Sequence, residues 1–328
     1  MRKRCIKNKK LIYFFCFIYI KQKYNNTAIL LKMYKLNKSI NIKNIEWDRL
    51  VLNPNAISLL EQNLDKLDFY SWKNLSENPN AIPLLEKNQD KIDWTWLSRN
   101  PNAIPLLEKN PDKINWEWLS ENPNAMHLLE KNQDKIDWSW LSRNPNAIPL
   151  LEANPDKIDW FALSENPNAI PLLEANPHNI EWALLSSNRN AIPLLAANPD
   201  KIDWLVLSRN PNAIPLLETN RDKIVWAILS ANPNAIPLLE KNPKKIDWAS
   251  LSENPNAIHL IEQNLDKLDD ECWGYLSENP CIFELDYEAL TSRCCIYKEE
   301  LMQITMHPSR IQKLLDMGIS IDELDNYI

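Results

Sequence analysis

Glycine is almost absent from this chain of 328 residues, in which only Gly274 and Gly318 occur. Loops that cradle nucleotide phosphates need glycines, because a backbone without side chains lets its N–H groups approach the ligand closely. Neither glycine lies in a Gly-rich loop. The sequence therefore excludes nucleotide sites of the Walker, Rossmann and protein-kinase types.

Acidic residues are missing from the first 32 positions, which carry nine of the 37 Lys and Arg side chains. Residues 33–328 consequently hold 28 basic and 44 acidic side chains, a net charge of −16. A body of this charge repels phosphate backbones, so the composition argues against a nucleic-acid partner.

Cysteines are few, and their spacing matches no known framework. Of six, Cys5 and Cys16 lie near the N-terminus, and the other four lie at positions 272, 281, 294 and 295. This pattern does not resemble a disulfide framework, which favours a reducing compartment. Cys272, Cys281, Cys294 and His307 have intervals unlike those of zinc ligands. We predict no metal and no cofactor.

What the chain does have is a repeat marked by tryptophan, at positions 47, 72, 94, 116, 138, 160, 182, 204, 226, 248 and 273. The spacing is 22 residues for eight successive steps and 25 for the first and the last. The consensus is N-P-N-A-I-P-L-L-E-x-N-x-D-K-I-D-W-x-x-L-S-x. Self-similarity of this kind is typical of solenoids.

One unit, residues 144–165, predicts two short helices. Asn146 is a good N-cap for a helix over 147–152, because its side chain can accept a backbone hydrogen bond. Asn154 tolerates the left-handed conformation that ends a helix. Asp159 is a second N-cap, for a helix over 160–164.

Helices this short are unstable alone in water, since isolated helices need about 12–15 residues. Stacked neighbours must therefore supply the burial. A leucine-rich-repeat horseshoe has a similar period, but Pro and Asn interrupt every candidate strand. We predict an all-α fold, an α-solenoid of about eleven 22-residue repeats with two short helices each. At a helix spacing of about 8–10 Å, it would form a rod or superhelix about 80–100 Å long.

The pattern L-x-x-N-P-N-x-x-x-L-L resembles the leucine-rich-variant repeats, which alternate short α and 3₁₀ helices. More closely, N-P-N-A-I-x-L-L-E and I-D-W-x-x-L-S-x-N resemble repeat proteins of amoeba-infecting giant viruses of the mimivirus group. The match spans about residues 44–281, and Asn188-Arg189-Asn190 departs from N-P-N in one turn. The resemblance implies fold and source but no activity.

The two ends differ from the repeats, which suggests three regions: 1–32, a repeat solenoid over 33–281, and a helical C-terminal cap over 282–328. Residues 11–20 are apolar but too few to span a membrane, which takes about 20. Residues 1–32 are either an upstream extension of a protein that starts at Met33, a signal or membrane anchor, or a basic tail. In the last region we expect helices over 284–292 and 297–306 and a third that ends near Gly318.

The best candidate for a partner-binding surface is an aromatic column two positions after the repeat Trp. It holds Trp96, Trp118 and Trp140 in consecutive repeats, and Phe161 would extend it. Aromatic anchors dominate binding hot spots. The alternative is that this column is half-buried core, because later repeats carry aliphatic residues there.

Other columns favour structural roles. The repeat tryptophans are expected to form the core, namely Trp72, Trp94, Trp116, Trp138, Trp160, Trp182, Trp204, Trp226 and Trp248. The alternating Glu77, Arg99, Glu121, Arg143 and Glu165 predict an ion-paired surface stripe. The Asn columns are explained by capping and turn chemistry.

No catalytic constellation stands apart from the repeat, and repetition makes every environment alike. We therefore expect a non-catalytic scaffold that binds a protein partner, in the host cytoplasm or in a virus particle. The alternatives are a structural, virion-associated component that assembles with its own copies and, third, an enzyme. A membrane contact is expected only if residues 1–32 are an anchor.

Overall fold

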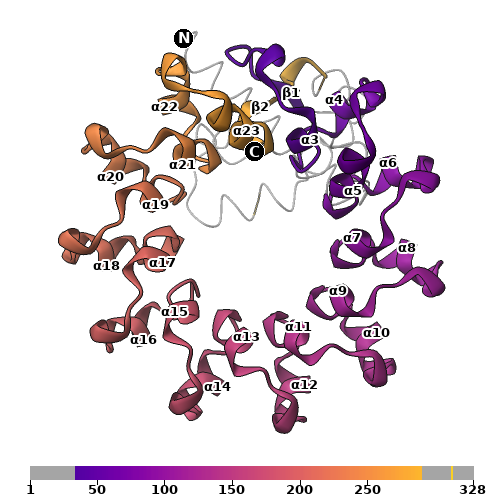
Figure 1. Ribbon diagram of the computed structural model, residues 1–328, viewed down its shortest axis with the longest axis vertical. Coiled ribbons are helices and arrows are strands. Elements are labelled where there is room, and N and C mark those ends of the chain that lie inside the picture. The colour runs from indigo at the N-terminus through magenta and orange to yellow at the C-terminus, as the bar shows by residue number, and fades with distance from the viewer. Residues whose placement is uncertain (1–33, 290–311, 313–328) are drawn as a thin grey trace. The chain divides into compact units, whose positions relative to one another are not determined.

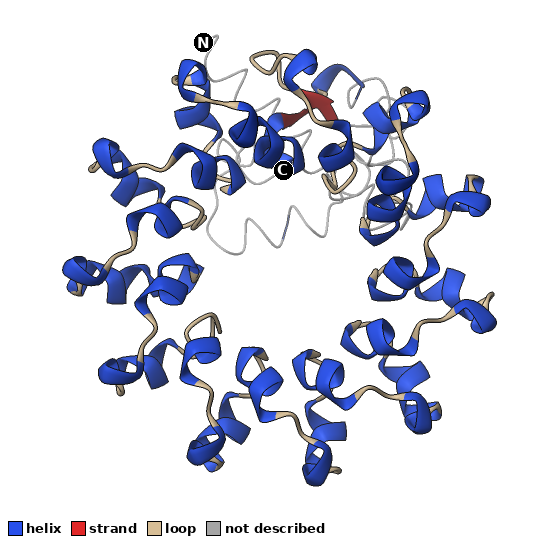
Figure 2. Ribbon diagram, in the orientation of Figure 1, coloured by secondary structure: helices blue, strands red, loops and turns tan. Residues whose placement is uncertain are grey.

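The computed structural model describes residues 34–289 and residue 312. The chain divides into two compact units, one formed by residues 37–282 and the other by residues 1–36 with 283–328. The first unit, called here the repeat unit, contains the repeats. Helices predominate in the described residues (Figure 2).

Eleven helices of the repeat unit carry the repeat tryptophan and are called here the Trp helices. They are α3 (Trp47–Leu50), α5 (Phe69–Glu77), α7 (Trp94–Arg99), α9 (Trp116–Glu121), α11 (Trp138–Arg143), α13 (Trp160–Glu165), α15 (Trp182–Leu185), α17 (Trp204–Arg209), α19 (Trp226–Ser230), α21 (Trp248–Glu253) and α23 (Asp270–Glu278). Within the repeat unit they follow one another around the inner circumference (Figure 1).

A second set of helices begins after the Asn-Pro-Asn turns, or after Asn188-Arg189-Asn190 in one repeat, and lies on the outer circumference (Figure 1). These Leu-Leu helices are α4 (Ile57–Glu61), α6 (Ile82–Lys87), α8 (Ile104–Glu108), α10 (Met126–Lys131), α12 (Ile148–Glu152), α14 (Ile170–Ala175), α16 (Ile192–Ala196), α18 (Ile214–Thr219), α20 (Ile236–Glu240) and α22 (Ile258–Glu262). The α-solenoid predicted from the sequence is confirmed.

Each repeat also contains a one-turn 3₁₀ helix between its two α-helices, which the two-helix repeat did not include. These are η2 (Leu64–Lys66), η3 (Gln89–Lys91), η4 (Pro111–Lys113), η5 (Gln133–Lys135), η6 (Pro155–Lys157), η7 (Pro177–Asn179), η8 (Pro199–Lys201), η10 (Arg221–Lys223), η11 (Pro243–Lys245) and η12 (Leu265–Lys267). Three further 3₁₀ turns are η1 (Ile42–Asn44), η9 (Pro211–Ala213) and η13 (Pro280–Ile282).

Of the caps predicted for residues 144–165, the one at Asp159 is correct, and those at Asn146 and Asn154 are wrong. Asp159 caps α13 as expected, accepting a hydrogen bond from the N–H of Ala162. Asn146 does not cap α12, whose N-cap is Ala147. Asn154 has φ −135° and ψ 60°, not the left-handed conformation, and its Nδ2 donates 2.9 Å to the carbonyl of Leu150.

A buried ladder of asparagines joins neighbouring repeats. Asn122 is fully buried, and its Nδ2 donates to the carbonyl oxygens of Ser98 and Asn100 in the preceding repeat, at 3.0 and 2.9 Å. Its Oδ1 accepts from the N–H of Asn124, whose own Nδ2 donates 2.8 Å to Pro101. The amide thus uses both donors and its acceptor, which satisfies backbone groups that would be costly to bury unpaired.

The same bonds recur around the repeat unit, from Asn53 to Asn254. The turn with Arg189 in place of proline keeps its bond, because Asn212 donates 2.8 Å to the carbonyl of Arg189. A serine column adds a second link: Ser98 Oγ donates to the carbonyl of Trp94 and accepts from the N–H of Asn115 in the next repeat.

Apolar side chains fill the space between the two layers of helices. Leu97, Ala103 and Leu107 are fully buried, and the equivalent positions of the other repeats are buried in the same way. Full burial of a leucine side chain stabilises the fold by about 1.5–3 kcal/mol. The core is therefore a continuous layer that no single repeat could form.

The last repeat packs on the first, so the repeat unit closes on itself. Helix α23 contacts α3, and Asn53 Nδ2 donates to the carbonyls of Ser277 and Asn279 at 3.0 and 2.8 Å. Two further bonds of the regular repeats recur at the junction. Asn55 Nδ2 donates to the carbonyl of Pro280, and the N–H of Glu46 donates to the Oγ of Ser277. The predicted rod is therefore wrong, because the ladder continues through the junction.

Side chains at this junction fit it specifically. Arg49 Nη1 lies 2.8 Å from Glu278 Oε1, and its guanidinium lies 5.1 Å from the ring centre of Tyr275. A side chain at Gly274 would meet atoms of Glu46 and Arg49 at 3.0–3.2 Å. Glycine at this one position therefore allows α23 to approach the first repeat closely.

In the other unit, strand β1 (Tyr34–Leu36) pairs with strand β2 (Phe283–Leu285) in antiparallel register. The helix predicted over 284–292 is therefore wrong at its start, because Glu284 is in a strand and the helical segment begins at residue 287. Asp286 precedes it and accepts hydrogen bonds from the N–H groups of Glu288 and Ala289. Of the other elements expected in 290–328, the structure describes only residue 312, which is helical, and residues 1–32 lie outside the described residues.

Candidate partner-binding surface

The Trp helices lie on the inner circumference of the repeat unit (Figure 1), and each has residues that are not buried. In α7 the buried residues are Leu97 and Ser98, whereas Thr95 is exposed and Trp96 and Arg99 are half-buried. The positions one, two and five residues after the repeat Trp are exposed or half-buried in most repeats, the exceptions being the buried Ala162, Ala231 and Gly274. Their chemistry differs from one half of the repeat unit to the other.

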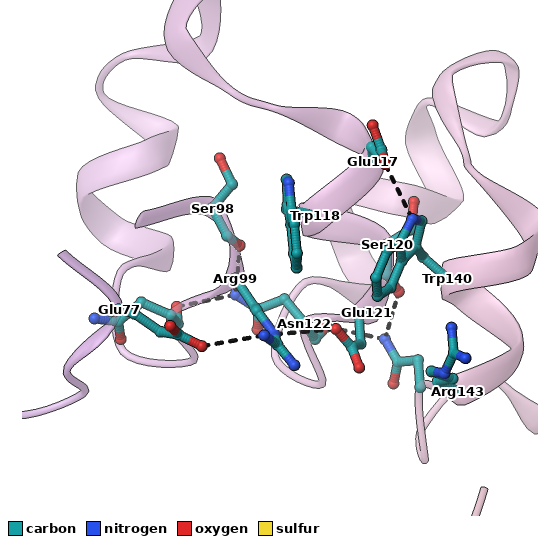
Figure 3. A network of polar contacts seen from close by, with 12 residues as sticks. Glu77, Ser98, Arg99, Glu117, Trp118, Ser120, Glu121, Asn122, Trp140 and Arg143 are labelled. Carbon is teal, nitrogen blue, oxygen red and sulfur yellow. Dashed lines mark hydrogen bonds and ion pairs between the residues drawn. The ribbon is translucent and has the colours of Figure 1, made fainter. Parts of the chain in front are cut away.

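Three tryptophans stack in the half formed by α7, α9 and α11. The ring centres of Trp96 and Trp118 are 5.4 Å apart with planes at 28°, and those of Trp118 and Trp140 are 4.8 Å apart at 35°. All three are half-buried. The predicted aromatic column therefore exists as a stack, called here the Trp ladder; Figure 3 shows two of its members, Trp118 and Trp140.

Phe161 does not extend the Trp ladder. It follows Trp160 directly, so it lies one position before the ladder column, which in that repeat holds the buried Ala162. The side chain is 57% exposed, and no ring contact within the described residues joins it to Trp140. The expected extension is therefore wrong, and the ladder ends at Trp140.

Cations flank both ends and the edge of the ladder. The Lys73 ammonium lies 5.6 Å from the centre of Trp96, and the guanidinium groups of Arg99 and Arg143 lie 5.2 Å from the centres of Trp118 and Trp140. Such contacts are attractive because the ring face carries partial negative charge. Trp140 also donates from Nε1 to Glu117 Oε1 at 3.1 Å (Figure 3).

The predicted charged stripe is ion-paired beside the ladder (Figure 3). Arg99 lies between two carboxylates, with Nη1 3.2 Å from Glu77 Oε1 and Nε 3.0 Å from Glu121 Oε2. Burial raises the pKa of Glu77, Arg99 lowers it, and Glu121 raises it again, with a net rise above the ordinary value. Arg143 pairs with Glu165 at 2.9 Å.

The opposite half presents aliphatic residues at the equivalent positions. Leu205 is 54% exposed, and with Val206 and Ile228 it lines an open groove of about 340 Å³. The charged column is interrupted there by Ser187 and Ala231, so Arg209 reaches past the adjacent repeat to pair with Glu253. One inner surface therefore has an aromatic, charged half and an aliphatic half.

The repeat tryptophans are less buried than a core position implies. Among the nine predicted, Trp72 is 8% exposed, and the other eight are half-buried: Trp94, Trp116, Trp138, Trp160, Trp182, Trp204, Trp226 and Trp248. The ring of Trp94 is covered by Lys113 of the next repeat at 4.6 Å, and that of Trp138 by Lys157 at 4.5 Å. The fully buried columns are instead the leucines, alanines, serines and ladder asparagines.

The asparagine ladder is the feature that sequence reasoning missed. Capping and turn chemistry accounts for the Oδ1 bond of Asn100, to the N–H of Asn102, but not for its two bonds to the preceding repeat. The sequence does contain a sign of these bonds, because the first Asn of each turn recurs even where Arg189 replaces the proline.

Within residues 34–289 and at 312, no cluster of His, Cys, Asp and Glu could hold a metal ion. Cys294 and His307 of the four-residue set considered for zinc lie outside the described residues. Burial, and then Glu262, raises the pKa of Cys281 to about 12.

None of the described helices is long and apolar enough to cross a membrane. No protein-family model, no curated protein and no solved structure matches this chain.

Proposed function

We propose that the repeat unit is a scaffold that binds another protein through the Trp ladder. The observation that carries the proposal is the stack of three half-exposed tryptophans flanked by arginines. Tryptophan and arginine are the residue types most enriched at binding hot spots. The stack is held in place by its neighbours, so a partner would lose little entropy in ordering it.

Charge supports a protein ligand in preference to a nucleic acid. Residues 33–328 carry a net charge of −16, and carboxylates of Glu77, Glu117 and Glu121 lie beside the ladder. Phosphates would be repelled by this surface. The resemblance of the repeats to those of giant-virus proteins leads us to propose a partner from the infected host or the virus particle.

The test compares the full chain with a triple variant, Trp96→Ala with Trp118→Ala and Trp140→Ala, as affinity baits in lysate of amoeba cells. The matched control is a variant of the aliphatic half, Leu205→Ala with Val206→Ala and Ile228→Ala. Thermal unfolding measured by circular dichroism establishes that each bait is folded. We expect a partner to be captured by the parent and by the control, but not by the ladder variant.

A direct binding measurement with the purified partner completes the test. Loss of affinity by about ten-fold or more in the ladder variant supports the proposal, since a hot-spot aromatic contributes about 2 kcal/mol or more. Equal capture by all three baits contradicts it. Sedimentation of the parent into large homo-oligomers, without captured partners, would favour a structural component that assembles with its own copies. Reproducible turnover of a substrate would favour an enzyme.

A further inference from the structure

The second repeat differs from its neighbours by three additional residues. Helix α5 begins at Phe69, so Phe69, Tyr70 and Ser71 precede the repeat tryptophan, Trp72. Phe69 and Tyr70 are 75% and 67% exposed, and their rings meet edge to face at 5.6 Å. Two adjacent aromatic rings of this exposure are unusual, because burying one stabilises a fold by about 1.5–3 kcal/mol.

A lysine–tryptophan contact that recurs in five repeats is not formed at Trp72. A lysine lies over the ring of the tryptophan 19 positions earlier in five pairs: Lys113 on Trp94, Lys135 on Trp116, Lys157 on Trp138, Lys201 on Trp182 and Lys267 on Trp248, at 4.5–5.1 Å. At the second repeat the equivalent lysine is Lys91. Its Nζ lies 3.5 Å from Asp90 Oδ2, and Lys91 and Trp72 are instead two walls of a cavity of about 660 Å³.

The cavity combines apolar walls with carboxylates. Its apolar lining consists of Leu64, Leu67, Phe69, Trp72 and Ile92. Its charged lining consists of Asp65, Asp68, Asp90 and Asp93 with Lys73 and Lys91. The carboxylates outnumber the ammonium groups by two, and the Lys73 ammonium also lies over Trp96.

Two of the four carboxylates are N-caps of helices, and the other two form exposed ion pairs. Asp68 and Asp93 accept backbone hydrogen bonds as N-caps, and those from Ser71 hold the pKa of Asp68 below its ordinary value. Asp65 and Asp90 have side chains 77% and 76% exposed, and each pairs with the lysine next to it in sequence, at 4.0 and 3.5 Å. Pairs this exposed contribute little to stability, so they exchange partners readily.

We propose that this cavity binds an arginine side chain of a protein ligand. Phe69 would cover the flat face of the guanidinium, and Asp65 and Asp90 would accept its hydrogen bonds. Arginine fits better than lysine, because a planar guanidinium can stack on a ring and bond to carboxylates at the same time. The five lysine–tryptophan pairs show that this fold places cations on aromatic rings in the same part of other repeats. Lys73 borders both the cavity and Trp96, but the proposal does not rest on the function proposed for the Trp ladder.

The last repeat provides an internal contrast, because α23 carries an insertion of the same length without aromatic residues. There Asp270, Glu271 and Cys272 precede Trp273. Lys267, which precedes this insertion, lies 4.5 Å from the centre of Trp248. The aromatic pair is therefore a property of the second repeat and not of the longer helix.

The test is a ¹⁹F NMR titration of the full chain, labelled with fluorinated phenylalanine, with the methylamide of N-acetyl-arginine. The chain has six phenylalanines, and a Phe69→Leu variant assigns the Phe69 signal by its loss. The neutral analogue of the same shape, the methylamide of N-acetyl-citrulline, is the ligand control. Phe161, the other strongly exposed phenylalanine among the described residues, is the control within the same spectrum.

We expect the Phe69 signal to move saturably with the arginine compound, at the millimolar affinity of a single side chain, while the Phe161 signal stays in place. A double variant, Asp65→Asn with Asp90→Asn, should weaken binding by about five-fold, since both carboxylates lose their charge. The absence of a saturable shift at Phe69, or equal shifts with the citrulline compound, would overturn the proposal. Unchanged affinity in the double variant would overturn the role of the carboxylates.

Discussion

The Trp helices of residues 94–143 and those of residues 160–231 share one buried framework and present different surfaces. In both halves the ladder asparagines and the leucines of the Trp helices are buried to the same extent. The exposed positions hold stacked tryptophans and ion pairs in the first half, and Phe161, Leu205, Val206 and Ile228 in the second. The buried columns are thus repeated while the exposed ones diverge.

This difference separates the residues that hold the fold from those available for binding. Asn122 and Asn210 form the same two bonds to the preceding repeat although their exposed neighbours differ. A substitution on the exposed surface therefore leaves the asparagine ladder in place. We expect variants of the asparagine ladder to have the same stability in the two halves, and variants of the exposed surface to differ between the halves.

The largest effect on the free energy of unfolding is expected at the asparagine ladder. Asn122→Ala and Asn210→Ala should each lower the free energy of unfolding by about 3–5 kcal/mol, because each leaves two buried carbonyls and one N–H without partners. Urea unfolding followed by circular dichroism measures both. Asn124→Ala, which removes one exposed bond to Pro101, is the matched control and should cost about 1 kcal/mol. A clear difference between the two ladder variants would break the comparison.

The repeat tryptophans should show the next largest effect, with a difference between halves. Trp138→Ala should cost about 3 kcal/mol and Trp160→Ala about 2, since both rings are half-buried but only Trp138 is covered by a lysine. The residue equivalent to Lys157 in the next repeat is Asn179, which explains the missing cover. Thermal unfolding of the two variants tests the order. Equal losses would show that the cation does not contribute.

The stability of the fold should depend on pH through the charged stripe of Glu77, Arg99 and Glu121. Because burial raises the pKa of Glu77 above that of an unfolded chain, the folded state holds this proton more tightly, and stability falls as pH rises through the raised pKa. Arg99→Gln removes the group that lowers this pKa, so the pKa should rise further. It should also cost about 2 kcal/mol at neutral pH, as Glu121 Oε2 loses its cation. Carbon NMR titration of the Glu77 carboxyl measures the pKa, and a fall would contradict the assignment.

The smallest effect is expected on the aliphatic surface. Leu205→Ser should change the free energy of unfolding by about 0.5 kcal/mol or less, because more than half of the side chain is already exposed. Trp118→Ala, at a stacked position of the other half, should cost about 2 kcal/mol. A loss for Leu205→Ser as large as that for Trp118→Ala would mean that the aliphatic half is covered in the folded protein.

The sequence predicts the repeats and the Trp ladder because both depend on spacing alone. It does not predict the closure of the repeat unit, which depends on a small rotation per repeat that accumulates over eleven copies. The 3₁₀ helices were not predicted as separate elements, because a segment of three residues such as Pro155, Asp156 and Lys157 is too short to show a helical pattern of apolar residues. Phe161 was misplaced by one position, and in a helix one position turns a side chain by about 100° away from the stack.

The closure of the ladder between the first and the last repeat is the central claim, and a distance measurement by electron paramagnetic resonance tests it. Spin labels at the exposed residues Asp48 and Glu271 of α3 and α23, attached through unnatural amino acids, avoid the native cysteines. Since packed helices lie about 8–10 Å apart, the account predicts one narrow distribution below about 30 Å. A broad distribution centred beyond about 50 Å, as an open stack of eleven repeats would give, would contradict it.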